Sequence, residues 1–214
     1  MHRATHILAH TASILLHPLL MPMYGMLLLC AHIYFLQDQQ NIQQVFSIYS
    51  GMIILGTFLL TLFIPAGTIL LMWKLKHIDS LHIADPKQRT APYLFTILSY
   101  AVWTYFLHAI LHLPPFITRI AIGAIIALVA VTIINLWWKI SAHLTGIGGL
   151  LGGVCSYALC SSQMLTPTMA IILIIALLLM YARIYLDAHT PLQVVCGLLL
   201  GLLSTFLPNF IIYA

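Results

Sequence analysis

The chain contains no glutamate and has only four acidic and eight basic residues among its 214 residues. A soluble domain carries about 25% charged residues, whereas this chain carries 6%. So few charges cannot cover a surface that faces water, and this excludes an ordinary soluble domain. The net charge of +4 is small, and the basic residues lie at the ends of apolar runs. It therefore gives no indication of a nucleic-acid partner.

Cysteine is scarce as well. The four cysteines lie inside apolar runs, without the spacing of a metal site or of a disulfide framework, and we expect buried free thiols (Cys30, Cys155, Cys160 and Cys196). Histidines four residues apart occur near the N-terminus and at His108 and His112, but no carboxylate or cysteine joins either set in sequence. We predict neither a metal site nor a cofactor.

Most of the chain, 62% of it, is apolar. The apolar runs are long and rich in Leu and Ile, without the alternation typical of a membrane β-barrel, and each suits a helix of about 20 residues that crosses a bilayer. The predicted spans are 11–36, 45–73, 92–112, 116–138, 141–160, 167–185 and 191–213. The first contains the break His17-Pro18, so we expect a kinked helix or a re-entrant turn there. The sequence predicts an all-α polytopic membrane bundle with six to seven transmembrane helices, as a single domain over residues 1–214.

The charges gather in three stretches, from Lys74 to Arg89, from Lys139 to His143 and from Arg183 to His189. Charges are costly inside a bilayer, so such a grouping favours a polar site at one membrane face. Counting spans from the third onward places the connections at 113–116 and 161–166 on the opposite face. All three charged stretches are therefore predicted to lie on the same side, where they can converge.

Pairs of glycines four residues apart occur in the fifth and seventh predicted spans, at 148/152, 149/153 and 197/201. Such pairs let membrane helices approach closely. We expect these two spans, which adjoin two of the charged stretches, to pack tightly against neighbours.

The residue types in the three stretches suit phosphoryl transfer. Arg183 and His189 are six residues apart between two predicted spans, and His143 opens another span just after Ser141. Arginine and lysine neutralise phosphoryl oxygens, while one histidine can attack phosphorus and another can protonate the leaving group. A helix that begins near Ser141 adds backbone N–H donors for an anion. The alternative reading is that these are ordinary interfacial residues.

Three short segments also match a known pattern. Residues 140–143 read Ile-Ser-Ala-His, and Arg183 is followed by five residues, His189, three residues and Gln193. In the first stretch Arg89 follows His82 by seven residues. Over about residues 80–200 the chain resembles the type 2 phosphatidic acid phosphatase superfamily, whose helical core is shared with vanadium haloperoxidases. That signature reads Lys, six residues, Arg-Pro; then Pro-Ser-Gly-His; then Ser-Arg, five residues, His, three residues, Asp.

The resemblance implies a role for each matching residue. His189 would be the nucleophile that forms a phosphohistidine, and His143 would be the general acid on the leaving alcohol. Arg89 and Arg183 would bind the phosphoryl group. The candidate site residues are thus His189, His143 and Gln193 for catalysis, and Arg183, Arg89, Lys87, His82 and Ser141 for phosphate binding.

Three departures from the family pattern bear on the chemistry. His82 stands in place of the lysine, and Thr90 in place of the proline after the arginine. Lys87 is our candidate for the missing cation. Gln193 replaces the aspartate that orients the nucleophile; its amide oxygen accepts a hydrogen bond but brings no negative charge. Asp187 could substitute if the turn brings its carboxylate to the ring.

We therefore expect an integral membrane phosphatase of a bacterial inner membrane, which hydrolyses a lipid phosphomonoester or diphosphate through a phosphohistidine. The missing Lys and Asp leave open whether the chain is an enzyme. The alternative is a non-catalytic membrane protein that binds lipid phosphates or acts in assembly on the same fold. A small transporter is a weaker reading because no span carries a charge deep in its middle.

The side of the membrane that the site faces stays open. If the first run spans once, seven of the eight Lys/Arg residues lie on the site side and only Arg119 lies near the other face. The positive-inside rule then places the site in the cytoplasm. The resemblance implies otherwise, since many relatives face the periplasm or lumen.

Overall fold

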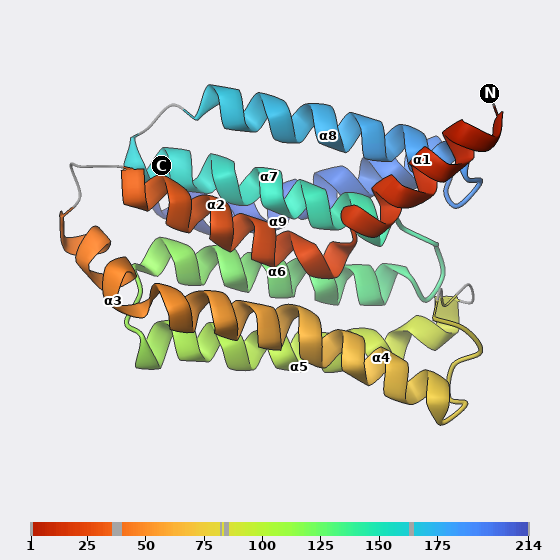
Figure 1. Cartoon of the computed structure of the whole chain (residues 1–214), viewed down its shortest axis with the longest axis horizontal. Coiled ribbons are helices and arrows are strands. Elements are labelled where there is room, and N and C mark those ends of the chain that lie inside the picture. The colour runs from red at the N-terminus through yellow and green to blue at the C-terminus, as the bar shows by residue number, and fades with distance from the viewer. Residues whose placement is uncertain (1, 36–39, 82, 84–85, 163–164, 214) are drawn as a thin grey trace.

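The structure is a computed structural model that describes residues 2–35, 40–81, 83, 86–162 and 165–213. Within those ranges the chain is 85% helical and has no strand. Six helical segments are long and apolar enough to cross a membrane, or seven if the bent N-terminal pair counts as one span. The prediction of an all-α polytopic bundle is confirmed, and Figure 1 shows the helices lying side by side along the long axis of the molecule.

The helices follow the predicted spans closely. Their bounds are α1 (His2–Leu15), α2 (Met21–Phe35), α3 (Gln40–Thr57), α4 (Ile64–Lys74), α5 (Thr90–Tyr105), α6 (Pro115–Ile134), α7 (Ala142–Ser161), α8 (Thr166–Tyr185) and α9 (Pro191–Tyr213). Short 3-10 turns lie at Pro18–Leu20 and Pro86–Arg89, and π-helical turns at Phe58–Phe63 and Phe106–Ile110. α3, the first π-turn and α4 form one apolar segment, Phe46–Lys74.

The N-terminal segment is the least well predicted. Helix α1 begins at His2, well before the predicted start at Thr11, and it meets the next helical segment at an angle of 42°. The break falls at His17-Pro18 because proline has no N–H to continue the α1 hydrogen-bond ladder. His17 instead caps the following 3-10 turn with its own side chain. The expected kink is present, and the two halves run from one end of the bundle to the other (Figure 1).

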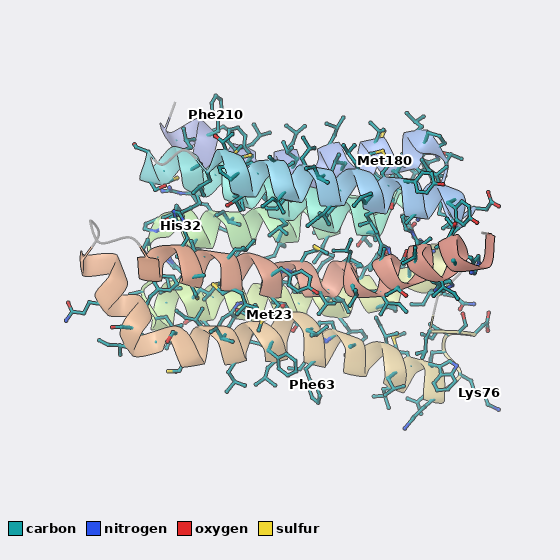
Figure 2. The ribbon with its side chains drawn as sticks, turned by 45° about the horizontal axis from the view of Figure 1, so that its top comes forward. Met23, His32, Phe63, Lys76, Met180 and Phe210 are labelled. Atoms are coloured by element: carbon teal, nitrogen blue, oxygen red, sulfur yellow. The ribbon has the colours of Figure 1, made fainter. Side chains whose placement is uncertain are left out.

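Apolar side chains cover the sides of the bundle, as expected for a surface that faces lipid. Phe63 is 60% exposed and Phe210 is 41% exposed. Figure 2 shows both pointing away from the ribbon, while Lys76 lies at the end of the molecule. Exposed apolar surface on this scale is rare on soluble monomers.

The three charged stretches lie at one end of the bundle. Figure 1 shows the α4–α5, α6–α7 and α8–α9 connections at the end where α1 begins, whereas the C-terminus lies at the other end. The predicted parity is therefore confirmed. Helices α7 and α9 both begin at this end, and α8 ends there, so Ala142, Tyr185 and Pro191 all mark the same level.

Glycines bring α7 and α9 into close contact. A Cβ on Gly148 or Gly152 would collide with the backbone of α9 at Leu198 or Leu202, and a Cβ on Gly201 would collide with the carbonyl of Thr145. The two glycine-bearing spans thus pack against each other, backbone to backbone, as small residues in membrane helices allow.

The four cysteines are free, as expected, but they are half-buried rather than buried. They lie on helices whose outer faces meet lipid. An apolar thiol carries no penalty in that surrounding, so nothing requires these side chains to face the interior.

Candidate active site

A cavity of about 540 Å³ runs through the bundle and ends in polar side chains at the charged end. The residues that line this polar end are His17, Arg89, His143, Arg183 and His189. His143 from the second stretch and Arg183 and His189 from the third therefore share one cavity with Arg89 from the first stretch. Large apolar cavities with a few convergent polar groups are the usual form of a ligand site.

His189 is held by the side chain of Gln193. Its Nδ1 lies 3.1 Å from Gln193 Oε1, and the same oxygen accepts the backbone N–H of Thr190 at 3.1 Å. That second bond fixes which end of the amide faces the ring. Because a carbonyl oxygen only accepts, His189 Nδ1 must carry the proton. Nε2 of His189 is left with its lone pair, which is the form a nucleophile needs.

The electrostatic environment keeps His189 neutral. Burial is the main reason that the pKa of His189 is lowered to about 4. The hydrogen bond that His189 donates to Gln193 opposes this lowering of the pKa, and the positive charges of Arg183, Lys139 and Arg89 add to it. At neutral pH the imidazole is therefore unprotonated at Nε2.

His143 and Arg183 are joined through Ser13 of α1. His143 Nε2 lies 3.1 Å from the Ser13 carbonyl, and Arg183 Nη1 donates to Ser13 Oγ at 3.2 Å. Ser13 Oγ in turn donates to the carbonyl of Ala9. Since the Ser13 carbonyl only accepts, His143 carries a proton at Nε2. Its Nδ1 is the nitrogen left to exchange a proton with a ligand.

Within the described ranges, the charged groups that act on Lys139 are all cations. Burial lowers the pKa of Lys139, and the nearby charges of Arg89 and Arg183 lower it further. The buried Nε of Arg183 makes no hydrogen bond within the described part of the chain. Arg89 donates Nε to the carbonyl of Ile83 at 2.8 Å. Cations that are shielded from water repel one another strongly. Their proximity is unfavourable unless an anion lies close enough to offset the repulsion.

Ser141 is placed differently from the expectation. Its side chain is fully buried and accepts the N–H of Leu144 at 3.4 Å, so it caps α7. Ser141 is not among the residues that line the cavity, whereas its neighbours Ala142 and His143 are. The backbone N–H of Ser141 also donates to the carbonyl of Gln193 at 3.3 Å. Ser141 thus ties the start of α7 to the start of α9.

Three further residues were named from the sequence. His82 lies outside the described residues, as does the side chain of Lys87. Asp187 is described: it is exposed, has a left-handed backbone with φ of 50°, and is not among the groups that act on His189. Gln193, rather than Asp187, therefore orients the ring.

Ser13, His17 and Lys139 were not assigned to the site from the sequence. One signal was available for the first two. Positions 6, 10, 13 and 17 carry His, His, Ser and His, a spacing that places polar side chains on one helix face. Of these four, Ser13 and His17 contact the site, whereas His6 and His10 are exposed. For Lys139 the signal was its place in the second charged stretch.

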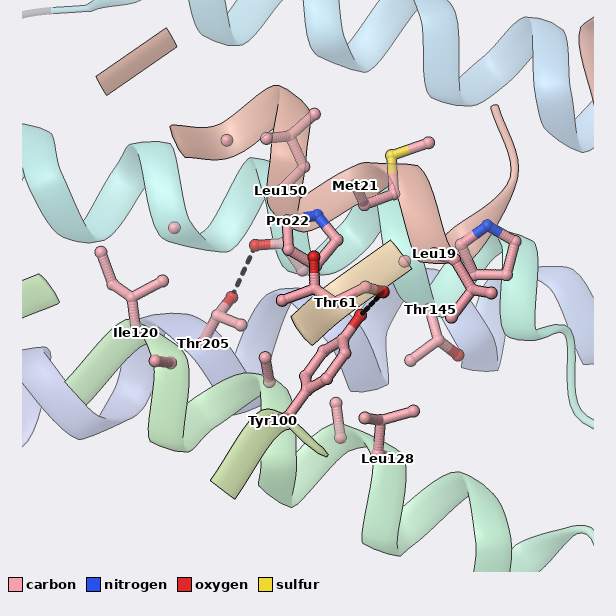
Figure 3. A pocket seen from close by; sticks show the side chains of 18 of the residues that line it. Leu19, Met21, Pro22, Thr61, Tyr100, Ile120, Leu128, Thr145, Leu150 and Thr205 are labelled. Carbon is pink, nitrogen blue, oxygen red and sulfur yellow. Dashed lines mark hydrogen bonds between the residues drawn. The ribbon is translucent and has the colours of Figure 1, made fainter. Parts of the chain in front are cut away.

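The rest of the cavity is mainly apolar and follows one face of α7. On α7 a lining residue recurs every three or four positions from Ala142 to Tyr157. At the rise of an α-helix, these two residues are about 22 Å apart along the helix axis. Figure 3 shows side chains from several helices around its middle, among them Leu19, Ile120 and Leu150. One pairing of polar atoms there is the hydrogen bond that Thr205 donates to the carbonyl of Gly149 at 2.9 Å.

No group of three or more His, Cys, Asp or Glu side chains within the described ranges is arranged to hold a metal ion. Comparisons with known protein families, with curated proteins and with solved structures find no match to this chain.

Proposed function

We propose that this protein is an integral membrane phosphatase that hydrolyses a lipid phosphomonoester or diphosphate through a phosphohistidine, in the manner of the type 2 phosphatidic acid phosphatases that its motifs resemble. The observation that carries the proposal is the state of His189. It is buried, neutral and protonated on Nδ1 by its bond to Gln193, so that Nε2 is free beside several cations.

The cations supply the binding of the phosphoryl group. Arg183 and Arg89 line the cavity, and Arg183 has a buried Nε with no protein partner among the described residues. A phosphate would satisfy that donor and offset the repulsion between the two guanidinium groups. The first turns of α7 and α9 add the positive ends of two helix dipoles at the same level.

The reaction uses His189 with a free lone pair on Nε2 and His143 as its imidazolium, a form that the negative charge of a bound phosphoryl group favours. His189 Nε2 attacks phosphorus while the bond from phosphorus to the leaving oxygen breaks, and that oxygen takes a proton from Nδ1 of protonated His143. Neutral His143 then removes a proton from water, which attacks the phosphohistidine and releases inorganic phosphate. Breaking the P–N bond returns the lone pair to His189.

The apolar part of the cavity supports a lipid as the substrate. It continues from the histidines along α7 between membrane-spanning helices. A headgroup held by Arg183 and Arg89 would therefore have its tail inside the bundle. A water-soluble phosphate ester would leave this space unfilled.

Phosphate release from lipid phosphates by the purified chain tests the proposal. Phosphatidate, phosphatidylglycerol phosphate, undecaprenyl diphosphate and lipid A are a suitable panel. We expect release with at least one of them, and its loss in His189→Ala. His108→Ala, an exposed histidine on the π-turn at the other end of the bundle, is the matched control and should keep the parent rate. Release that is unchanged in His189→Ala would contradict the proposal.

The neutral amide of Gln193 favours one alternative, a protein that binds lipid phosphates without hydrolysing them. A carboxylate at this position would stabilise the cationic form of His189 during the reaction, and an amide does so less well. Tight binding of a lipid phosphate by the parent, together with no phosphate release from any member of the panel, would establish the binding function.

A further inference from the structure

His17 brings a third histidine to the polar end of the cavity. It comes from the break between α1 and α2 and not from any of the three charged stretches. Its ring stands edge-on to that of His143, with centroids 5.4 Å apart, and it lines the same cavity as Arg183 and His189. The charge of Arg183 is close enough to act on it.

The backbone fixes the protonation of His17. The N–H of Leu19 donates to Nδ1 at 3.3 Å, because His17 caps the short 3-10 turn Pro18–Leu20. A neutral imidazole has one nitrogen that accepts and one that carries hydrogen. With Nδ1 as the acceptor, the hydrogen of neutral His17 is on Nε2. The described residues provide no hydrogen-bond partner for that Nε2.

The three histidines therefore present different groups to the cavity. His189 offers a lone pair on Nε2, because its hydrogen is on Nδ1 and is donated to Gln193 Oε1. His143 has its Nε2 bound to Ser13 and keeps Nδ1 for proton exchange. His17 offers an N–H donor. A neutral donor adds a hydrogen bond to an anion without adding to the repulsion among Arg89, Lys139 and Arg183.

We propose that His17 is a ligand of the phosphoryl group, which donates Nε2–H to a non-bridging oxygen, and that the broken N-terminal helix is thereby a wall of the active site. This inference rests on the proposed function, since it takes a phosphoryl group as the occupant of the site. It also assigns Ser13 as a positioning residue that holds His143 and Arg183 in place.

The variant His17→Asn separates the two roles of this side chain. Asparagine keeps the ability to cap the 3-10 turn, but its shorter side chain does not carry a donor to the place of Nε2. His6→Asn is the matched control, an exposed histidine on α1 that does not line the cavity. The probe is inorganic phosphate, and orthovanadate in a second titration, with the full chain in detergent micelles.

We expect His17→Asn to raise the dissociation constant for both probes by roughly 10- to 100-fold, the range for a hydrogen bond to a charged group. His6→Asn should stay within about twofold of the parent. Equal affinity of His17→Asn and parent overturns the inference. So does a parent that binds neither probe.

A second measurement does not depend on the folding of a variant. In the parent labelled with ¹⁵N-histidine, NMR should show His17 protonated on Nε2 and His189 on Nδ1, and phosphate should shift the His17 signal. A His17 signal that does not move overturns the inference even if the protein hydrolyses lipid phosphates. If phosphate shifts the signal and no substrate is hydrolysed, the inference stands and the catalytic part of the proposed function fails.

Discussion

At the scale of single residues, the protonation of each histidine follows from one neighbour whose hydrogen-bonding capacity is fixed. Gln193 Oε1 can only accept, and the N–H of Thr190 determines that this atom, and not the amide nitrogen, faces His189. The Gln193 amide therefore does part of what a carboxylate would do: it sets the tautomer. It does not provide the charge that stabilises an imidazolium.

Restoring the carboxylate should raise the rate. We expect Gln193→Asp to increase kcat on a lipid phosphate, by up to the roughly 10⁴-fold that a serine protease triad loses with its aspartate. Gln193→Leu, which removes the acceptor and keeps a similar size, should lower kcat below that of the parent. Steady-state phosphate release measures both. A Gln193→Leu variant as fast as the parent would show that the amide does not orient His189.

The pH profile gives an independent reading of the same pair. Burial lowers the pKa of His189 to about 4, so the unprotonated form persists down to that pH and is lost as the pH falls through it. In Gln193→Asp the added negative charge favours the imidazolium and moves the acid limb of kcat/KM to higher pH. The substrate ionises in the same way in both experiments. A difference between the acid limbs of the two profiles therefore comes from the ionisation of a group on the enzyme. Superimposable acid limbs would contradict this account of His189.

Arg89 is the contribution of the first charged stretch. Its guanidinium lines the cavity while its Nε is held by the carbonyl of Ile83. We expect Arg89→Ala to weaken vanadate binding by roughly 10-fold or more, since a charged hydrogen bond is lost. Lys76→Ala, an exposed cation on the same connection, controls for net charge and should leave the affinity unchanged. Equal losses in both variants would mean that Arg89 acts only through its long-range field.

At the scale of helices, the contact between α7 and α9 sets the distance between His143 and His189, the two histidines that the proposal gives catalytic roles. His143 lies in the first turn of α7, and His189 precedes the first turn of α9. Gly148, Gly152 and Gly201 allow backbone contact between the helices. A side chain at any of them would separate α7 from α9 and with them the two rings.

Gly201→Ala should therefore destabilise the protein and reduce activity together. The added Cβ would collide with the carbonyl of Thr145 and lie 2.6 Å from the nitrogen of Gly149. Overpacking of this kind costs about 1–3 kcal/mol, visible as a lower Tm in detergent. Gly67→Ala is the matched control, because nothing lies within 4 Å of its Cβ. A Gly201→Ala protein as stable as Gly67→Ala would argue against a tight α7–α9 contact.

The elements differ in how far the sequence predicts them. Spans such as Pro191–Tyr213 follow from continuous apolar runs bounded by proline or charge, and the structure has them within a few residues. The predicted start of the first span, at Thr11, is too late by nine residues. The histidines before Thr11 make that part of the sequence look too polar for a membrane-spanning helix. The placement of Ser13 and His17 against His143 depends on contacts across about 130 residues of sequence, and local patterns do not encode such contacts. By contrast, the pairing of His189 with Gln193 was predictable, because Gln193 stands where the family pattern that the chain resembles has the residue that orients this histidine.

At the scale of the whole molecule, the bundle joins a polar end to an apolar interior. The cavity lies among membrane-spanning helices, and its far part includes His32 and Tyr157, whose rings meet edge to face with centroids 5.4 Å apart. His32 is labelled in Figure 2 on the α2 side of this region. If the substrate is a lipid phosphate, as proposed, its tail would lie in this space, and the length of the space would then discriminate between chain lengths.

Filling the cavity should discriminate between long and short substrates. Ala124 lines the cavity on α6 between Ile120 and Leu128, one turn away on either side. Ala124→Phe should reduce kcat/KM for a long-chain lipid phosphate about 10-fold or more, the scale of a methylene-sized misfit in an apolar pocket. A short-chain alkyl phosphate should be little affected. Ala66→Phe, on an exposed position of α4, is the control. Equal effects of Ala124→Phe on both substrates would place the tail outside the bundle.

The covalent intermediate is the most direct test of the central claim. The purified chain would be mixed with a lipid phosphate that it hydrolyses, quenched in alkali within one turnover, digested and mapped by mass spectrometry. We predict a phosphoryl group on Nε2 of His189 in the parent and none in His189→Ala. Release of phosphate at the parent rate, with no phosphoryl group on His189 at any quench time within the turnover, would contradict the account.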